Sequence, residues 1–148
     1  MKTLGTLLLT LLLYTQSFAA SPFSLEALQG VNVTILNKQK LLSDTSVEAL
    51  QKEMEAKLGK AGLQTSTKHF SNLLIKIQTQ KTKETTLAHI TLSLVENAKL
   101  KRASSVEAIA ITYTKDDFFE VSNMETDLKE SIFFLLDEFI DQFKEENK

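Results

Sequence analysis

Two histidines, His69 and His89, are the side chains of this sequence best suited to metal or acid–base chemistry. Neither has a Glu or His at the spacing of a helical zinc motif such as H-x-x-E-H or H-E-x-x-H. A zinc site also needs three or four convergent protein ligands. The sequence therefore predicts no metal site and no cofactor, with His89 pointing out from a strand and His69 in a loop.

Carboxylates occur in two suggestive pairs. Asp137 and Asp141 lie one helical turn apart and offer the oxygen ligands that Ca²⁺ or Mg²⁺ prefers, but the polar face of an amphipathic helix needs charge there in any case. Asp116 and Asp117 would suit general acid–base work. Adjacent aspartates between two strand-like runs are more often a turn, because Asp bonds its own backbone there, and we expect a turn.

Signatures of catalysis are absent from the sequence. It has no G-x-S-x-G, no Ser-x-x-Lys and no cysteine, and its four glycines leave little for a phosphate-binding loop. No catalytic residue is predicted, and His89, Glu107 and Asp117 are the only loose candidates for an enzyme. Lys99, Lys101 and Arg102 form a small basic loop without interleaved aromatic residues, so no nucleic-acid partner is expected at a net charge of −2.

The first residues predict export. Lys2 precedes an apolar run from Leu4 to Tyr14, and Ser17 and Ala19 stand at the −3 and −1 positions of a cleavage site. We expect a signal peptide over residues 1–19, cleaved after Ala19 or one residue later. The alternative is an uncleaved anchor, but the run is shorter than the roughly 20 residues of a membrane span.

The mature chain is expected to be one domain, residues 20–148, in the periplasm or outside the cell. Export permits disulfides, yet the chain has no cysteine to form them or to carry a lipid, so the fold must depend on its core. No later apolar run is long enough for an integral membrane segment.

Two stretches have the apolar spacing of amphipathic helices. Residues Met124 to Glu145 carry a stripe of Leu128, Ile132, Leu135, Leu136, Phe139 and Phe143. Val47 to Leu58 is the second, opened by a capping box from Thr45 to Glu48. Gly62 suits a left-handed position after it, with Leu58 and Leu63 in the contact of a Schellman motif. Ser122 and Glu125 predict a capping box for the terminal helix.

Alternating residues predict strands over 31–36, 73–78 and 88–94, with a further strand over 106–114. In this last run Ile109, Ile111 and Tyr113 are the bulky phase, which we assign to the core. A short return strand is expected over 118–121. The order predicts an α+β fold: a two-layer sandwich, β-α-β-β-β-(β)-α, with a mostly antiparallel sheet and both helices on one face.

Three segments carry a resemblance to known proteins: EMEAKLGKAGL over 53–63, AITYT over 110–114, and LDEFID over 136–141 followed by Asn147. In these the chain resembles a loose group of small exported bacterial proteins of unknown function, which often have Trp where this chain has Tyr113. The order of elements is also similar to that of the lipopolysaccharide-assembly lipoprotein of the outer-membrane translocon, at the level of fold. This chain departs from that lipoprotein in having no lipid-bearing cysteine.

The favoured function is a soluble, non-enzymatic binding or envelope-accessory module whose partner is another envelope or extracellular protein. Its candidate surface is the sheet face without helices, comprising Lys76, Gln78, His89, Thr91, Ser93 and Thr112. The competing interpretation is that this face is simply solvated. A free sheet edge can also accept a strand from a partner. The sequence does not determine the oligomeric state.

The alternative is a carrier that holds a small apolar ligand between sheet and helices. Its pocket would be lined by Phe133, Phe134, Phe139, Ile111 and Tyr113. The competing interpretation is that these residues fill a close-packed core.

Overall fold

The computed structural model describes residues 24–66, 68, 70–99 and 106–148. Its elements are β1 (Gly30–Leu36), α2 (Asp44–Lys60), β2 (Gln64–Thr65), β3 (Asn72–Lys81), β4 (Thr86–Lys99), β5 (Glu107–Glu120) and α3 (Met124–Glu146). The expected signal peptide over residues 1–19, together with His69, Lys101 and Arg102, lies outside the described residues. Within the described part, no helix combines the length and apolar character that a bilayer crossing needs.

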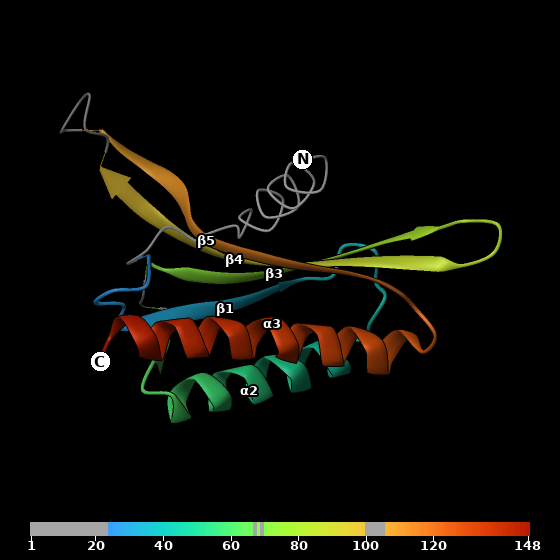
Figure 1. Cartoon of the computed structure of the whole chain (residues 1–148), viewed down its shortest axis with the longest axis horizontal. Helices are drawn as coiled ribbons and strands as arrows, with labels where there is room; N and C mark the ends of the chain where they lie inside the picture. Colours follow the sequence, from blue (N-terminus) through green and yellow to red (C-terminus); the bar gives the residue numbers. More distant parts are fainter. Residues whose placement is uncertain (1–23, 67, 69, 100–105) are drawn as a thin grey trace, which may run out of the picture.

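The five strands form one mixed sheet in the order β2-β1-β3-β4-β5. β1 runs parallel to both β2 and β3, whereas β3, β4 and β5 are antiparallel neighbours. A parallel pair needs a long crossover, and α2 supplies it between β1 and β3. Figure 1 shows both helices on the same side of the sheet. The predicted α+β class and two-layer arrangement are therefore confirmed.

The core lies between the helices and one face of the sheet. From α3, Ile132, Leu136 and Phe139 are fully buried, and from the sheet Ile75 and Ile90 meet them from the other layer. Tyr113 of β5 packs edge-on against Phe139 at 5.3 Å between ring centroids and 78° between planes. The apolar stripe of the terminal helix thus has the partner it requires.

The end of α2 follows the predicted motif. Gly62 has φ +96, the left-handed conformation that glycine adopts without strain. The Leu63 N–H donates to the Leu58 carbonyl at 3.1 Å, and the Gly62 N–H donates to the Gly59 carbonyl at 3.1 Å. These are the two hydrogen bonds of a Schellman motif.

The sequence places the N-cap of α2 two residues too late and the N-cap of α3 one residue too early. α2 is capped by Ser43, not Thr45, and the Ser43 hydroxyl accepts from the Ser46 N–H. α3 is capped by Asn123, not Ser122, because the Asn123 side chain reaches the Thr126 N–H. The Asp127 carboxylate accepts from the N–H groups of Ser122 and Asn123, so the return bond comes from Asp127, two residues beyond the expected Glu125.

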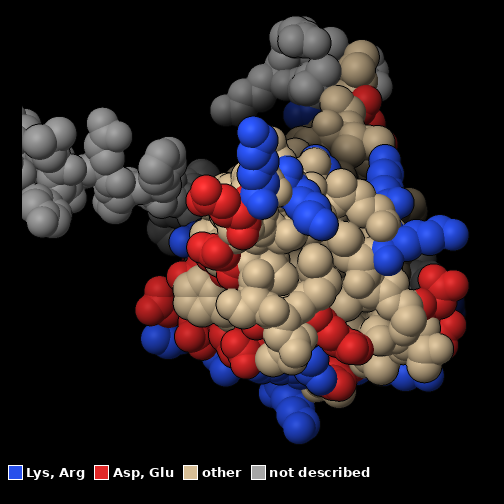
Figure 2. Space-filling view, turned by 90° about the vertical axis from the view of Figure 1, so that its right-hand side faces the viewer, with Lys and Arg blue, Asp and Glu red and all other residues tan. Residues whose placement is uncertain are grey.

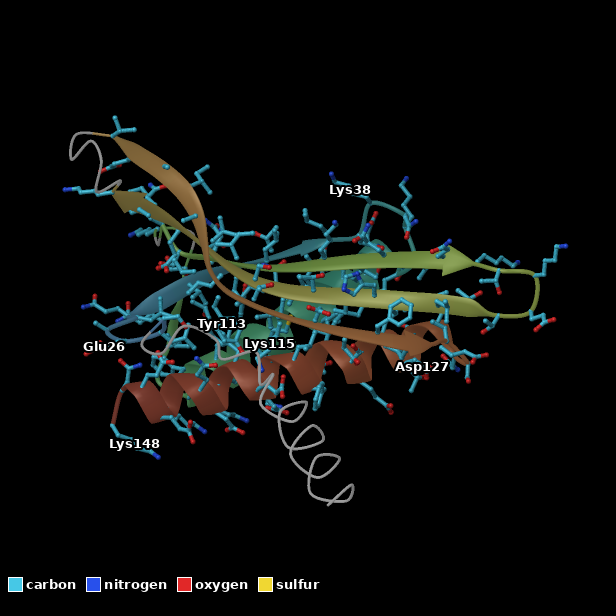
Figure 3. The ribbon with its side chains drawn as sticks, turned by 45° about the horizontal axis from the view of Figure 1, so that its top comes forward. Glu26, Lys38, Tyr113, Lys115, Asp127 and Lys148 are labelled. Carbon is cyan, nitrogen blue, oxygen red and sulfur yellow. The ribbon has the colours of Figure 1, made fainter. Side chains whose placement is uncertain are left out.

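β5 runs straight through the expected turn at Lys115–Asp117, and the prediction of a turn with a separate return strand is wrong. Alternation separates the charges: Asp116 is exposed, whereas Asp117 and Lys115 face α3. There Ser131 donates to the Asp117 carboxylate at 2.8 Å, and Lys115 lies 3.9 Å from Glu138. Figure 3 shows Lys115 and Tyr113 between β5 and α3. Tertiary partners therefore override the local turn preference of Asp.

A β-bulge reverses the phase of β5 and overturns the core assignment of two isoleucines. Leu94 pairs with Tyr113, but the next residue, Val95, pairs with Ile111, which leaves Thr112 without a register partner. One extra residue moves all earlier side chains of the strand to the opposite face. Ile111 is consequently 65% exposed and Ile109 78% exposed, whereas Tyr113 alone of the bulky phase is buried.

Candidate binding surface

The sheet face without helices is organised in rows by strand register. Lys76 pairs with Thr91 and Thr91 with Asp116, while Leu74 pairs with Ser93 and Ser93 with Thr114. Directly paired residues share a face, and these alternate with the buried residues of each strand. The predicted residues Lys76, Thr91 and Ser93 therefore lie together on this face.

A third row contains the most distinctive group. Gln78 pairs with His89, and His89 pairs with Phe118. Phe118 is 64% exposed, and it brings a large apolar side chain next to the polar side chains of Gln78 and His89. Its ring lies edge-on to the His89 imidazole, with centroids 6.2 Å apart and planes at 66°. We call Gln78, His89 and Phe118 the aromatic row.

The aromatic row borders a shallow hollow of about 380 Å³. Its lining consists of Gln78, Thr79, Gln80, Leu87, His89 and Phe118. Amide groups, one imidazole, one phenyl ring and one leucine offer a mixed surface that suits a side chain of a partner protein. Figure 2 views the neighbouring end of the molecule, where charged side chains surround an uncharged central surface.

Charge on this face comes from exposed side chains. His89 Nε2 lies 3.6 Å from an Asp116 carboxylate oxygen, and the side chains are 41% and 63% exposed. Lys76 is also exposed, two residues from Gln78 on β3. Both signs of charge thus flank the aromatic row, and water screens them.

Ser93 and Thr112 contribute less to this face than the sequence suggested. The Ser93 hydroxyl is 3.1 Å from that of Thr114, and Ser93 is only 7% exposed. Thr112 sits at the bulge, and its hydroxyl donates to the Glu96 carboxylate at 2.6 Å. Glu96 alternates in phase with buried Leu94, so Thr112 is turned toward the helix side and does not join the other five residues.

The sequence missed Phe118 and Asp116 as members of this surface. Both were placed in or beside a turn, and only the continuation of β5 brings them onto the face. Tyr113 points inward, so strict alternation after it places Thr114, Asp116 and Phe118 on the outside. That alternation was the available signal, and the Asp pair concealed it.

The loose enzyme candidates do not converge. His89 lies on the uncovered face, and Asp117 faces α3 and bonds Ser131. Glu107 begins β5 and pairs with Lys99, far along the strand from both. In the described part of the chain, no group of three or more His, Cys, Asp or Glu has metal-binding geometry. Asp137, one of the suggestive helical carboxylates, is paired with Lys57 at 2.6 Å.

The residues expected to line an apolar cavity also separate. Phe139 and Tyr113 lie in the core, in direct contact. Ile111 and Phe134 are exposed. Phe133 lies half-buried on the outside of the helix layer, where the ammonium groups of Lys57 and Lys129 stand 5.4 and 5.8 Å from its ring centroid. These five side chains therefore do not line one space.

Comparison with solved structures gives a likeness at the level of fold. The chain is similar to a minor lipoprotein from Acinetobacter baumannii, with a TM-score of 0.33 and 12% identity over 78% of this chain and 91% of that one. A likeness of this strength is a loose analogy of fold. No protein-family model matches the chain, and no curated protein matches it.

Proposed function

We propose that this protein is an exported, non-enzymatic binding module that docks another envelope or extracellular protein on the uncovered sheet face. The observation that carries the proposal is Phe118, 64% exposed beside His89 at the hollow of the aromatic row. Aromatic side chains in pockets with a polar surround dominate the energetics of many protein interfaces. The residues Lys76, Gln78, His89 and Thr91 supply that polar surround, and their role in binding is part of the proposal.

The rigidity of this face supports the same function. β3 and β4 pair over ten consecutive residues, and β4 pairs with β5 on its other side, so the aromatic row is held by three adjacent strands. A preformed surface loses less side-chain and backbone freedom on association. His89 and Phe118 are therefore positioned before any partner arrives.

The export of the protein is part of the proposal and rests on the N-terminal sequence. Lys2, the apolar run from Leu4 to Tyr14 and the small residues Ser17 and Ala19 have the order of a secretory signal. Intact-mass measurement of the protein from the envelope or culture medium is expected to give a chain beginning at Ala20 or Ser21. A full-length chain confined to the cytosol would contradict this part.

Affinity capture with matched variants tests the binding surface. Tagged protein over residues 20–148 is incubated with a solubilised envelope fraction, in parallel with Phe118→Ala and Phe134→Ala. Phe134 is a suitable control because it is also exposed, at 53%, but lies on α3 in the other layer. We expect a specific partner that Phe118→Ala loses at least tenfold and Phe134→Ala retains. Equal capture by all three proteins, or none above background, would overturn the proposal.

A further inference from the structure

The far ends of β4 and β5 form a two-stranded arm. β3 begins at Asn72, opposite Val95, so residues 96–99 of β4 have no β3 partner. They pair instead with 107–110 of β5. Figure 1 shows this arm rising away from the helices and from the rest of the sheet. The bulge beside Leu94 explains the bend, because an extra residue increases local twist and redirects the strand.

β5 is the last strand of the sheet, so its outer edge has no strand beside it among the described residues, and residues 96–99 of β4 form the other edge of the arm. The opposite edge of the sheet is β2, which has only two residues, Gln64 and Thr65. Short edge strands resist pairing with other chains, whereas long ones invite it. β5, with 14 residues, is the long edge strand of this sheet.

Charge divides β5 into two halves. From Ala108 to Thr114 the strand has no charged residue, no proline and no glycine. Lys115, Asp116 and Asp117 follow directly, and charges of this kind are how natural edge strands prevent pairing. The protection thus covers only the half beside α3 and leaves the arm open.

The arm also carries exposed apolar side chains on one face. Ile109 is 78% exposed and Ile111 65% exposed, and they pair with Asn97 and Val95 of β4. These two isoleucines lie beside an unpaired strand edge. Association of that edge with another strand would bury their apolar surface, which is favourable.

We propose that the β5 edge of the arm pairs antiparallel with the same segment of a second copy of this chain, centred on Ala110. This register places Ile109 opposite Ile111 of the second copy, and by symmetry the reverse, so four isoleucines form one patch. Cross-strand β-branched pairs of this kind stabilise sheets. The inference does not rest on the proposed partner at Phe118, which lies in the other half of β5.

Charge selects this register over the alternatives. A parallel pairing in register would set Glu107 against Glu107 of the second copy. An antiparallel pairing centred on Asp116 would set those two carboxylates directly opposite each other. Like charges directly opposite are destabilising in a sheet. Centring on Ala110 places Glu107 opposite Tyr113 of the second copy, and no charged residue lies opposite a like charge along 107–113.

A single introduced cysteine tests the geometry, because the chain has none of its own. At the symmetry centre, the two Cα atoms of residue 110 would lie about 4.5–5.5 Å apart, within the range of a disulfide. Residue 115 of each copy would be about 33 Å from its counterpart, at roughly 3.3 Å per residue over ten positions. Under mild oxidation, Ala110→Cys is expected to form a covalent dimer at least tenfold faster than Lys115→Cys.

Two further measurements complete the test on the protein over residues 20–148. Adding Ile109→Lys to Ala110→Cys is expected to abolish the cross-link, while Phe134→Lys leaves it unchanged. Sedimentation of the unaltered protein is expected to show a concentration-dependent dimer that Ile109→Lys makes monomeric. Equal cross-linking at 110 and 115, or an unaffected Ile109→Lys dimer, overturns the proposal. A monomer without any cross-link also overturns it, as expected if the edge serves a strand of a different protein.

Discussion

Replacing Tyr113 with phenylalanine removes one hydroxyl from the core while the ring keeps its contact with Phe139. Tyr113 is 3% exposed, and its hydroxyl has no hydrogen-bond partner among the described residues. An unsatisfied buried polar group costs roughly 1–3 kcal/mol. We therefore expect Tyr113→Phe to raise the free energy of unfolding by about 1 kcal/mol at pH 7, the lower end of that range.

The same substitution changes the response to alkaline pH. Burial raises the pKa of Tyr113 above its usual value, and the nearby carboxylates of Glu138 and Glu146 raise it further. The folded state therefore holds the phenolic proton more tightly than the unfolded state. The contribution of this proton to the free energy of unfolding is fully present below about pH 10. Above that pH it falls by about 1.4 kcal/mol per pH unit. At pH 11, the free energy of unfolding of Tyr113→Phe should exceed that of the unaltered protein by roughly 2–3 kcal/mol.

The assay is clean because residues 20–148 contain one tyrosine, Tyr113, and no tryptophan. Ultraviolet absorbance of tyrosinate therefore titrates this residue alone in the folded protein. Urea unfolding followed by circular dichroism, at pH 7 and pH 11, gives the stabilities of both proteins. A tyrosinate midpoint near pH 10 in the folded protein, or a Phe variant more than 1 kcal/mol less stable at pH 7, would refute the reasoning.

The remaining predictions use matched substitutions, each read as a change in the free energy of unfolding by urea denaturation. Ile90→Ala should cost about 2–5 kcal/mol and Ile111→Ala less than about 0.5, since Ile90 is buried and Ile111 exposed; equal costs would contradict the bulge. Gly59→Ala should stabilise α2 by about 0.5–1 kcal/mol because a Cβ there meets nothing within 4 Å. Gly62→Ala should cost about 1–2 kcal/mol because its φ is +96, and a stabilised variant would exclude the Schellman end. Ser131→Ala should cost roughly 1.5–3 kcal/mol by leaving the Asp117 carboxylate without its donor, and a neutral change would mean that water replaces it.

The helices were predictable because their signals are local. The stripe of α3 repeats at helical spacing, and the end of α2 depends on Leu58, Gly62 and Leu63 within one turn. Apolar and polar residues alternate regularly along β3 and β4. This alternation places Lys76, Gln78 and the residues that pair with them on the uncovered face.

β5 was less predictable because its phase depends on a non-local pairing. Alternation alone puts Ile109, Ile111 and Tyr113 on the same face. The extra residue is visible only in the pairing with β4, where Leu94 faces Tyr113 but Val95 faces Ile111. The Asp116–Asp117 turn failed for a related reason, since Ser131 lies on a helix that begins later in the chain. Phe118 was missed with it, although it is the most exposed aromatic residue of the uncovered face.

Photo-cross-linking in intact cells tests the proposed docking surface most directly. A photoreactive amino acid replaces Phe118 in one strain and Phe134 in another, both exposed positions that should tolerate it. We predict a discrete cross-linked product of one defined mass from position 118 and none from position 134. The same product from both positions, or no product from position 118, would contradict binding at the aromatic row.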